Sequence, residues 1–393
     1  MGILSAIASL LKPKQYAYMR LVDDYRPIFV QWGGVPYDND VVRAAVDTIA
    51  RNAAKLNPKH VRISDAGIFW LRSNLERILA LEPNPYMSAF DFYYRLITMR
   101  ELDNNAFALI VWDDENGEVK QLLPIACNQA EIVEDRTGTL YVRVWLLGEQ
   151  FVFPYSEVIH LRKFYYKSDV WGESNDPINT GLNILTTVEQ GLAEGVKTSA
   201  YLRGILKYQG ILKDEDVKRS RDRFVAEYLD IQKSGGVAAL DAKAEYIPIE
   251  SKPQLVDADQ LKVLKDKIYH YFGVNDAIVT GDYNEDQWTA FYESILEPIA
   301  VQMSLEFTRK IFTPKEIGHG NRIIFESNRL QYASTKTKTQ LIKELMQFGI
   351  LTINEAREIL NLAPVPDGDK RLVSLNYVSA EMQDIYQVGE GGE

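Results

Sequence analysis

The 393-residue sequence has very little cysteine, because Cys127 is the only one. A single cysteine cannot form a disulfide within the chain, so a disulfide framework is excluded and the composition fits a reducing compartment. Cys127 lies in the strand-like run LLPIACNQAEIV, with no histidine placed to activate its thiol. This context favours a small buried apolar residue over a catalytic nucleophile.

The sequence also lacks a long hydrophobic run. No apolar stretch reaches the length of about 18 residues that a membrane-spanning helix needs. The N-terminal MGILSAIASLLKPKQ is too short, and its lysines follow the apolar run, unlike those of a signal peptide. Ala6 stands where the myristoylation pattern needs Ser or Thr. We expect a short amphipathic segment that docks on this protein or on a neighbour, and no membrane partner.

The usual motifs of catalytic and metal sites are missing. The sequence contains no G-x-x-x-x-G-K-[ST], no G-x-S-x-G, no H-E-x-x-H and no C-x-x-C. The 4 histidines fall in different elements, and Glu157 and His160 would point to opposite faces of one strand. We therefore expect no catalytic residue, no metal site and no cofactor.

One acidic segment imitates a metal site. DYNED, residues 282–286, resembles the start of a calcium loop, and Glu293 stands at the twelfth position. However, Gln287 occupies the sixth position, where the sharp turn needs glycine, and a helix is expected from Trp288 onward. A solvated acidic loop between two helices is the favoured interpretation.

The sequence also has fewer basic than acidic residues. The chain has 44 Lys and Arg against 55 Asp and Glu, a net charge of -11. Such a chain does not wrap a duplex by neutralising phosphates, so any contact with nucleic acid should be local or weak. One basic cluster stands out, and it is either a solvated helix face or a contact surface for an acidic partner or phosphates. It comprises Lys218, Arg219, Arg221 and Arg223.

What is present is a globular composition, with 46% hydrophobic and 25% charged residues, and a length that suggests several domains. Helical periodicity predicts helices over residues 39–56 and from Ser88. From residue 106 to 161, strand-like runs alternate with turn signals such as Asp-Asp-Glu-Asn-Gly, which predicts an antiparallel meander. The fold class is therefore α+β.

The second half has a distinctive order of elements. A long helix over residues 182–202 precedes a small α/β insertion, in which residues 237–241 and 244–250 are predicted to form a hairpin. A second long helix over residues 255–272 follows. A polar loop and a third long helix over residues 288–312 come next.

The region after residue 328 is expected to be helical. It contains FGILTINEAREILNLAPVPDGD, residues 348–369, which predicts a well-specified helix followed by a proline stop. Thr352 and Glu355 match a capping box, and the buried face is expected to comprise Ala356, Ile359 and Leu360.

This last segment resembles the most recognisable segment of the portal proteins of long-tailed bacteriophages, a G-x-x-T-x-N-E-x-R run that leads into a Leu-Pro stretch and an acidic Gly turn. VVRAAVDTIARNAAKL, PNPYMSAFDFYYRLITMRELDNNAFALIVWD and YHYFGVNDAIVTGD are similar to further family blocks, in the family's order. The resemblance covers roughly residues 35–375. The sequence departs from the pattern at Asn275-Asp276-Ala277, where a proline-containing turn is common.

The resemblance implies a portal fold and a ring, usually of twelve subunits, at one capsid vertex. Double-stranded DNA would pass through the ring without sequence specificity during packaging and ejection. The implied parts are a wing of helices and antiparallel strands (residues 1–181), stem helices (182–203 and 253–273), an α/β clip (204–252), a tunnel loop (274–287), a long helix returning to the wing (288–327), and a helical crown with the C-terminal tail (328–393).

Particular residues follow from this correspondence. The tunnel loop would present Thr280, Gly281, Asp282, Tyr283, Asn284, Glu285 and Asp286 to the channel. The second stem helix could offer damped phosphate contacts from Lys262, Lys265 and Lys267. The basic cluster at Lys218, Arg219, Arg221 and Arg223 would lie on the clip surface that meets partners.

The resemblance also implies partners and a location. The partners would be further copies of the chain, the terminase motor, the head–tail adaptor, and the major capsid and scaffold proteins. The protein would reside in the virion, after assembly in the host cytoplasm. Two alternatives remain: a soluble multidomain enzyme such as a hydrolase, and another capsid-vertex adaptor. The lack of catalytic motifs disfavours the first, and the helix–insertion–helix order disfavours the second.

Overall fold

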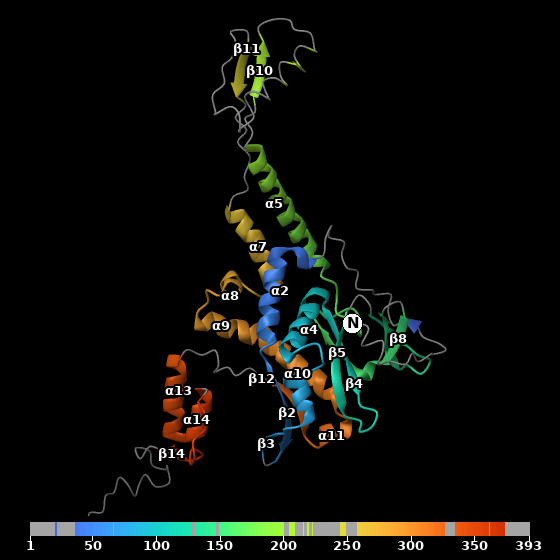
Figure 1. Ribbon diagram of the computed structural model, residues 1–393, viewed down its shortest axis with the longest axis vertical. Helices are drawn as coiled ribbons and strands as arrows, with labels where there is room; N and C mark the ends of the chain where they lie inside the picture. The colour runs from blue at the N-terminus through green and yellow to red at the C-terminus, as the bar shows by residue number, and fades with distance from the viewer. Residues whose placement is uncertain are drawn as a thin grey trace, which may run out of the picture. The chain divides into compact units, whose positions relative to one another are not determined.

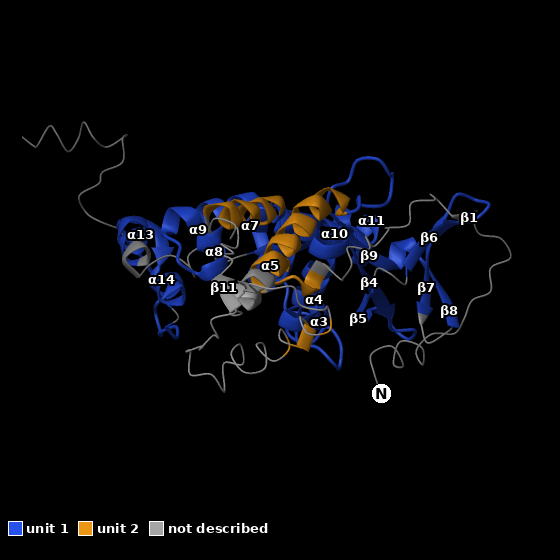
Figure 2. Ribbon diagram, turned by 90° about the horizontal axis from the view of Figure 1, so that it is seen from above, with its two compact units in different colours: residues 1–29, 43–174, 272–393 blue, residues 30–42, 175–271 orange. Residues whose placement is uncertain are grey.

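The computed structural model describes residues 20–21, 36–65, 67–126, 130–146, 149–199, 204–208, 215, 218–219, 222, 244–248, 258–326, 335–360 and 362–373. They form helices and antiparallel sheets, which confirms the α+β class (Figure 1). The chain divides into two compact units (Figure 2). Residues 30–42 and 175–271 form the second unit, which interrupts the first along the sequence.

Two antiparallel sheets of the first unit enclose a shared hydrophobic core. Their strand orders are β5-β4-β9 and β1-β6-β7-β8. Phe107 and Leu123 from one sheet and Ile132, Val142 and Phe151 from the other belong to one buried cluster, as expected where two sheets pack face to face. The strands are β1 (Arg20–Leu21), β4 (Asn105–Trp112), β5 (Val119–Ile125), β6 (Ala130–Glu134), β7 (Leu140–Leu146), β8 (Glu149–Pro154) and β9 (Val158–Arg162).

The single meander predicted over residues 106–161 was wrong, although its antiparallel strands were right. β9 returns to pair with β4, with Ala108 opposite Ile159, so β6, β7 and β8 belong to a separate sheet. Turn residues fix the hairpins locally, whereas the β4–β9 pairing joins distant residues and depends on burial of the shared core. Cys127 lies outside the described residues.

A third sheet joins the two sequence halves of the first unit. Its order is β12-β2-β3, and Ile323 pairs with His60. Helix α10 packs on β12, where the Phe307 and Phe325 rings lie 5.1 Å apart. The sequence reading missed this sheet because Pro58 and polar residues obscure its alternation. The elements are β2 (Asn57–Ser64), β3 (Gly67–Trp70), β12 (Asn321–Glu326) and α10 (Glu297–Ile311).

Two N-terminal helices, α2 and α4, form where they were predicted, whereas α3 was not predicted. Asn39 caps α2, because its side-chain oxygen accepts hydrogen bonds from the Val41 and Val42 N–H groups at 3.1 and 3.2 Å. Ser88 caps α4 by accepting from the Asp91 N–H at 3.2 Å. The helices are α2 (Asp40–Ala53), α3 (Asn74–Ala80) and α4 (Ala89–Asp103), with short turns η1 (Pro36–Asp38), η3 (Tyr155–Glu157), η4 (Asp176–Ile178) and α11 (Pro314–Gly318).

The second unit contains two antiparallel helices, α5 (Asn179–Ser199) and most of α7 (Ala258–Phe272). The Tyr271 hydroxyl donates to the Asn175 side-chain oxygen at 2.7 Å. Lys267, which precedes Tyr271 on α7, lies beside Gly181, which follows Asn175 in the chain. The two helices therefore run antiparallel. Within the described residues, no helix has the length and apolar character needed to cross a bilayer.

The described part of the insertion is a strand pair, β10 (Gly204–Tyr208) and β11 (Ala244–Pro248). They run antiparallel, with Leu206 opposite Tyr246. The sequence predicted residues 237–241 as the partner of residues 244–250. Residues 237–241 lie outside the described part of the chain, and the partner found for β11 is β10.

The C-terminal region is less helical than predicted. FGILT forms a strand that pairs with β14, so the helix begins only after Thr352. The capping box is confirmed: the Glu355 N–H donates to Thr352 Oγ1 at 3.1 Å, and the Thr352 N–H donates to Glu355 Oε2 at 2.7 Å. Ala356 is buried, but Leu360 is exposed. The elements are α13 (Thr335–Gln347), β13 (Phe348–Thr352), α14 (Ile353–Ile359) and β14 (Arg371–Val373).

The end of α4 holds two largely buried carboxylates with different surroundings. Glu101 is paired with Arg100 and Lys163. The carboxylate of Asp103 has no hydrogen-bond or ion-pair partner among the described residues, and burial raises its pKa to about 7. Its ionised form also lies at a helix C-terminus, where the backbone dipole disfavours negative charge. Asp103 therefore opposes folding when it is ionised.

This arrangement predicts a pH-dependent gain from Asp103→Asn. Because the folded pKa lies above the unfolded value, the stability contributed by the protonated carboxyl is present at low pH and lost as pH rises toward about 7. The variant's advantage in free energy of unfolding should grow from pH 5 to 7 and level off by pH 8, as measured by urea titration.

The difference between variant and wild type isolates Asp103 from His160, since burial lowers the pKa of His160 in both proteins. Asp114→Asn, in an exposed turn, controls for the loss of one negative charge. A difference between Asp103→Asn and wild type that stays constant across this pH range would contradict the assignment.

Candidate functional site

The seven residues predicted to line a channel lie in and between two short helices. α8 spans Asp276–Thr280 and α9 spans Glu285–Phe291. The prediction of one loop over residues 274–287 was therefore wrong in extent, because asparagines that cap helices were taken for loop residues. All seven residues are exposed in the structure: Thr280, Gly281, Asp282, Tyr283, Asn284, Glu285 and Asp286.

Local hydrogen bonds fix this acidic segment. Asn275 caps α8 by accepting from the Ile278 N–H at 2.9 Å. Asn284 and Gln287 form a capping box at the start of α9, with reciprocal bonds of 2.8 and 3.0 Å. The Tyr283 ring stacks on Trp288 at 5.2 Å. Local hydrogen bonds and ring stacking therefore define the conformation of this segment.

The charge of this segment has a single sign. Between residues 274 and 287 there are four carboxylates and no lysine or arginine. They are Asp276, Asp282, Glu285 and Asp286, all exposed. Glu285 and Asp286 lie in the first turn of α9, where the helix dipole stabilises negative charge. The segment therefore presents an acidic surface that repels phosphate.

A glycine controls how the acidic segment leaves α7. Gly273 has a positive φ of 84°, and a Cβ built there would lie 2.3 Å from Ile295 Cδ1. Any side chain at this position would be strained and would also displace Ile295. The sequence predicted only that the helix ends at residue 272, because the close approach of Gly273 to Ile295 is not a local feature.

Ile295 belongs to an irregular turn in the long helix predicted over residues 288–312. The helical path extends from α9 through η5 (Tyr292–Leu296), a π-helix, into α10. The Glu297 N–H bonds to the Tyr292 carbonyl, five residues earlier. Pro298 has no N–H and its ring would collide with the carbonyl of a regular turn, which accounts for the altered register. Proline inside the predicted helix was the available sequence signal.

The three lysines predicted to contact phosphates do not share one face of α7. Lys265 and Lys267 lie about 160° apart around the helix axis. Lys267 lies against Gly181 of α5, and Lys265 is close enough to Glu189 to oppose the rise in the pKa of Glu189 caused chiefly by burial. Lys262 is exposed. At most one or two of these lysines can face one surface.

The basic cluster of the insertion is only partly described. Lys218 and Arg219 are helical and exposed. Arg221 and Arg223 lie outside the described residues, so the structure does not group the four side chains.

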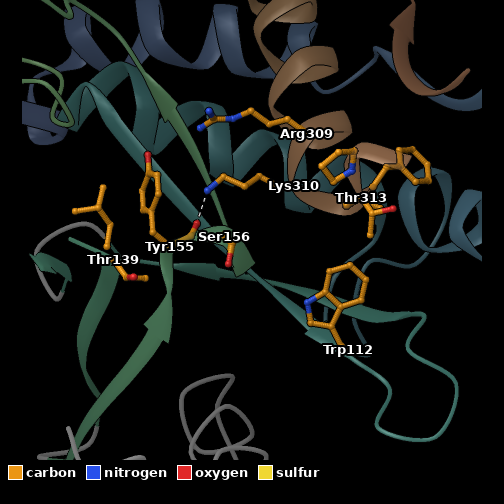
Figure 3. A pocket seen from close by; sticks show the side chains of 11 residues that line it. Trp112, Thr139, Tyr155, Ser156, Arg309, Lys310 and Thr313 are labelled. Carbon is orange, nitrogen blue, oxygen red and sulfur yellow. Dashed lines mark hydrogen bonds between the residues drawn. The ribbon is translucent and has the colours of Figure 1, made fainter. Parts of the chain in front are cut away.

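The sequence reading missed a cavity of about 560 Å³ in the first unit (Figure 3). Aromatic walls from Trp112, Tyr155 and Phe312 surround two cationic side chains, Arg309 and Lys310. The Lys310 ammonium hydrogen-bonds the Tyr155 carbonyl and lies 3.8 Å from the centre of the Tyr155 ring. Burial lowers the pKa of Lys310 to about 8, and burial chiefly raises that of Tyr155 to about 12.

Side chains beside this cavity are engaged in structural contacts. His160 is buried, with Nδ1 2.9 Å from the Tyr155 hydroxyl and Nε2 3.0 Å from Asn105 Oδ1. Arg309 bonds Glu306. Within the described residues no group of His, Cys, Asp and Glu is arranged to hold a metal ion. The cavity therefore has the contacts of a packed network and no free base beside a nucleophile.

Comparison with known proteins decides the family. Residues 40–361, most of the chain, match the family described as phage portal protein. The chain belongs to the phage portal protein family. The probable portal protein of Lactococcus phage p2 is 22% identical over 362 residues, which cover 88% of this chain and 87% of the phage protein.

Solved structures with portal-like folds agree with this membership. A chain of the virion of a native gene transfer agent particle matches with a TM-score of 0.64 and 18% identity, covering 92% of this chain and 99% of that chain. A chain from the neck of such a particle, computed with C12 symmetry, matches with a TM-score of 0.60 and 17% identity, covering 88% and 96%. At these identities the likeness shows the fold.

The portal-like C-terminal segment gains a physical explanation from its contacts. Asn354 binds the following turn, because its side chain bonds Val365 N–H at 2.9 Å and Asp369 Oδ1 at 2.8 Å. A Cβ on Gly368 would lie 2.1 Å from Asn354 Oδ1. Arg357 Nε donates to the Ala363 carbonyl at 2.7 Å. The motif residues therefore hold a helix and a proline-containing turn together.

The geometry around Gly273 predicts a larger cost for Gly273→Ala than for Gly281→Ala. Both glycines have φ near 83°, so both changes carry the left-handed penalty of about 1–2 kcal/mol. Only Gly273 faces a neighbour, since nothing lies within 4 Å of a Cβ at Gly281. Overpacking should add about 1–3 kcal/mol, measured as free energy of unfolding. Equal losses would show that Ile295 moves aside freely.

Proposed function

We propose that this chain assembles into a closed ring that forms the DNA channel at one capsid vertex. Membership of the phage portal family carries the proposal. The fold likeness to a neck chain from a C12-symmetric particle supports a ring of twelve. Cyclic assembly joins copies head to tail through two different surfaces of each chain.

The parts of the chain acquire roles within this proposal. Helices α5 and α7 form the stem, and residues 204–252 form the clip that docks terminase during packaging and the head–tail adaptor afterwards. Residues 1–181 and 288–327 form the wing, which meets the major capsid protein. Residues 328–393 form the crown inside the capsid, and scaffold proteins act during assembly.

The acidic segment suits a channel through which DNA must slide. With about -11 per chain, a ring of twelve carries a formal charge of about -130. The four exposed carboxylates of residues 274–287 repel the phosphate backbone and prevent tight adhesion. Lys262, exposed on α7, is the best placed of the three lysines for a weak phosphate contact, since Lys265 and Lys267 lie beside α5 residues.

An enzyme has less support than a channel. His160, which is buried in the core, uses both ring nitrogens in hydrogen bonds, and Lys310 of the cavity is held by the Tyr155 carbonyl. An adaptor function is disfavoured because the family match extends through both long helices and the insertion between them.

Electron microscopy and native mass spectrometry of the purified protein test ring assembly. Negative-stain images should show rings with a central hole, and native mass spectrometry should give one closed stoichiometry near twelve copies of the 44.9 kDa chain. Each measurement should be repeated across protein concentrations, because assembly depends on mass action. A species that stays monomeric at the highest concentration, with and without crowding agents, would contradict the proposal.

The channel role of the acidic segment is tested by Asp282→Lys. Asp282 is exposed between α8 and α9, so the change should leave the fold intact. In assembled rings it should strengthen binding of a short duplex by at least about tenfold at low salt, with a steeper salt dependence.

Asp114→Lys makes the same charge change at an exposed turn outside the segment and serves as the matched control. If both variants strengthened duplex binding equally, the effect would reflect net charge alone and residue 282 would not face the DNA path.

A further inference from the structure

Strand β3 is an edge strand whose apolar side chains are all exposed. It lies at the end of the β12-β2-β3 sheet, and its sequence is GIFW. The exposed fractions are 67% for Ile68, 49% for Phe69 and 48% for Trp70. Ile63, opposite Ile68 on β2, is 44% exposed. Apolar residues this exposed on adjacent strands mark a surface that another chain segment covers.

The backbone of β3 is open on its outer side. The Leu71 N–H donates to the His60 carbonyl at 2.9 Å, so position 71 faces β2. Alternation along an antiparallel strand then directs the N–H and C=O groups of Ile68 and Trp70 away from β2. Among the described residues, no strand pairs with this side. A single added strand could therefore form four backbone hydrogen bonds.

Edge strands usually carry a feature that prevents such pairing, such as a charged residue, a proline or a bulge. GIFW has none of these. Charges instead flank the strand: Lys59 and Arg72 lie 5.0 and 5.8 Å from the Trp70 ring, and Arg62 lies on β2. Lys59 is paired with Glu326 of β12 at 3.1 Å, so Arg62 and Arg72 carry most of the net positive charge of this border. Asp65 is the one carboxylate between residues 57 and 72. The open edge therefore has a net positive border in an acidic protein.

One end of the chain matches this border. Residues 374–393, which lie outside the described part of the structure, carry Glu381, Asp384, Glu390 and Glu393 and no lysine, arginine or proline. They include DIYQV, residues 384–388, a run with high β-propensity. By contrast, residues 1–19 carry Lys12 and Lys14 and no carboxylate side chain.

Length and tethering also favour the C-terminal segment. Twenty extended residues span about 65–70 Å, which exceeds the dimensions of a small domain. Because the segment belongs to the same chain as β3, its effective concentration at the edge is on the order of millimolar, so even weak strand pairing is populated. The occupant is then always present wherever the chain itself is present.

We propose that the acidic C-terminal segment of the chain, within residues 374–393, pairs with the open edge of β3 and covers Ile68 and Trp70. The pairing adds a fourth strand to the β12-β2-β3 sheet and places carboxylates near Lys59, Arg62 and Arg72. It blocks association of this edge with the edges of other chains. The inference does not rest on ring assembly.

Amide hydrogen exchange tests the proposal directly. In the full chain, the Ile68 and Trp70 amides should exchange slowly. Removal of residues 374–393 should speed their exchange at least tenfold, and high salt should weaken the protection. Adding a synthetic peptide of residues 374–393 to the shortened chain should restore it, whereas a scrambled peptide of the same composition should not.

A test substitution on β3 and a matched control on α10 show whether the peptide binds at the β3 edge. Ile68→Lys should weaken peptide binding to the shortened chain at least tenfold, measured by fluorescence anisotropy of a labelled peptide. Leu305→Lys changes a residue of α10 that is equally exposed, at 65%, and should leave binding unchanged. Equal weakening by both substitutions would overturn the location.

The remaining outcomes also decide the proposal. Fast exchange of both amides in the full chain would mean that nothing covers the edge. Slow exchange that persists without residues 374–393 would mean that another segment or another copy covers it. Protection by the scrambled peptide would reduce the interaction to charge alone. Each of these results would overturn the proposed pairing.

Discussion

The packing of Phe307 against Tyr93 and Phe325 is the contact on which the first unit depends. The chain leaves this unit after Ser174 and returns at Phe272, so its two sequence halves are joined by the pairing of β12 with β2 and by the side chains that pack beside it. Tyr93 from α4 and Phe325 from β12 have ring centres 5.3 Å apart, and Phe307 lies within 6.1 Å of both. Buried aromatic clusters of this kind supply both large apolar area and preferred geometry.

Polar side chains of α10 fix its position relative to the strands on either side. Gln302 donates to the Arg162 carbonyl of β9 at 2.8 Å, and the Ile323 N–H of β12 donates to Thr308 Oγ1 at 2.9 Å. Glu306 accepts from the His160 N–H at 3.2 Å. Because buried polar groups lose free energy when left unpaired, these bonds select one register of the helix. These bonds to β9 and β12 therefore fix how α10 lies against the core.

The position of α10 also fixes the end of the acidic segment, because a continuous helical path joins them. α9, the π-turn and α10 follow one another without a break, so Glu285 and Asp286 lie on a continuous helical element rather than in a free loop. Pro298 and Gly273 set the two irregular points of this path, and they meet through Ile295. In the channel proposed above, DNA would slide past an acidic surface, and that surface would need to be held at a fixed radius. The segment's short helices and caps are suited to that demand.

The sequence predicted features that local chemistry fixes, and failed where distant residues meet. The capping residues Asn39, Ser88 and Thr352 stand at the predicted starts of three helices, because a cap and its partner lie within a few residues of each other. The β4–β9 pairing, the β12-β2-β3 sheet and the approach of Gly273 to Ile295 join residues that no local pattern relates. The direction of Lys265 and Lys267 likewise depends on α5, which spacing along α7 cannot reveal.

Negative charge underlies two proposed features of the protein, the acidic segment of residues 274–287 and the acidic C-terminal segment. Carboxylates on a rigid helical segment keep a polyanion from adhering, because repulsion acts over about a Debye length of 10 Å without requiring contact. Carboxylates on a terminal segment complement a basic border such as that of β3, and there they act at contact distance. The positions of the carboxylates along the chain therefore determine these two proposed effects more than the net charge does. If copies of the chain associate as proposed, apolar edges such as that of β3 need to be covered until the correct surfaces meet. The proposed pairing of the acidic C-terminal segment with β3 would cover that edge reversibly.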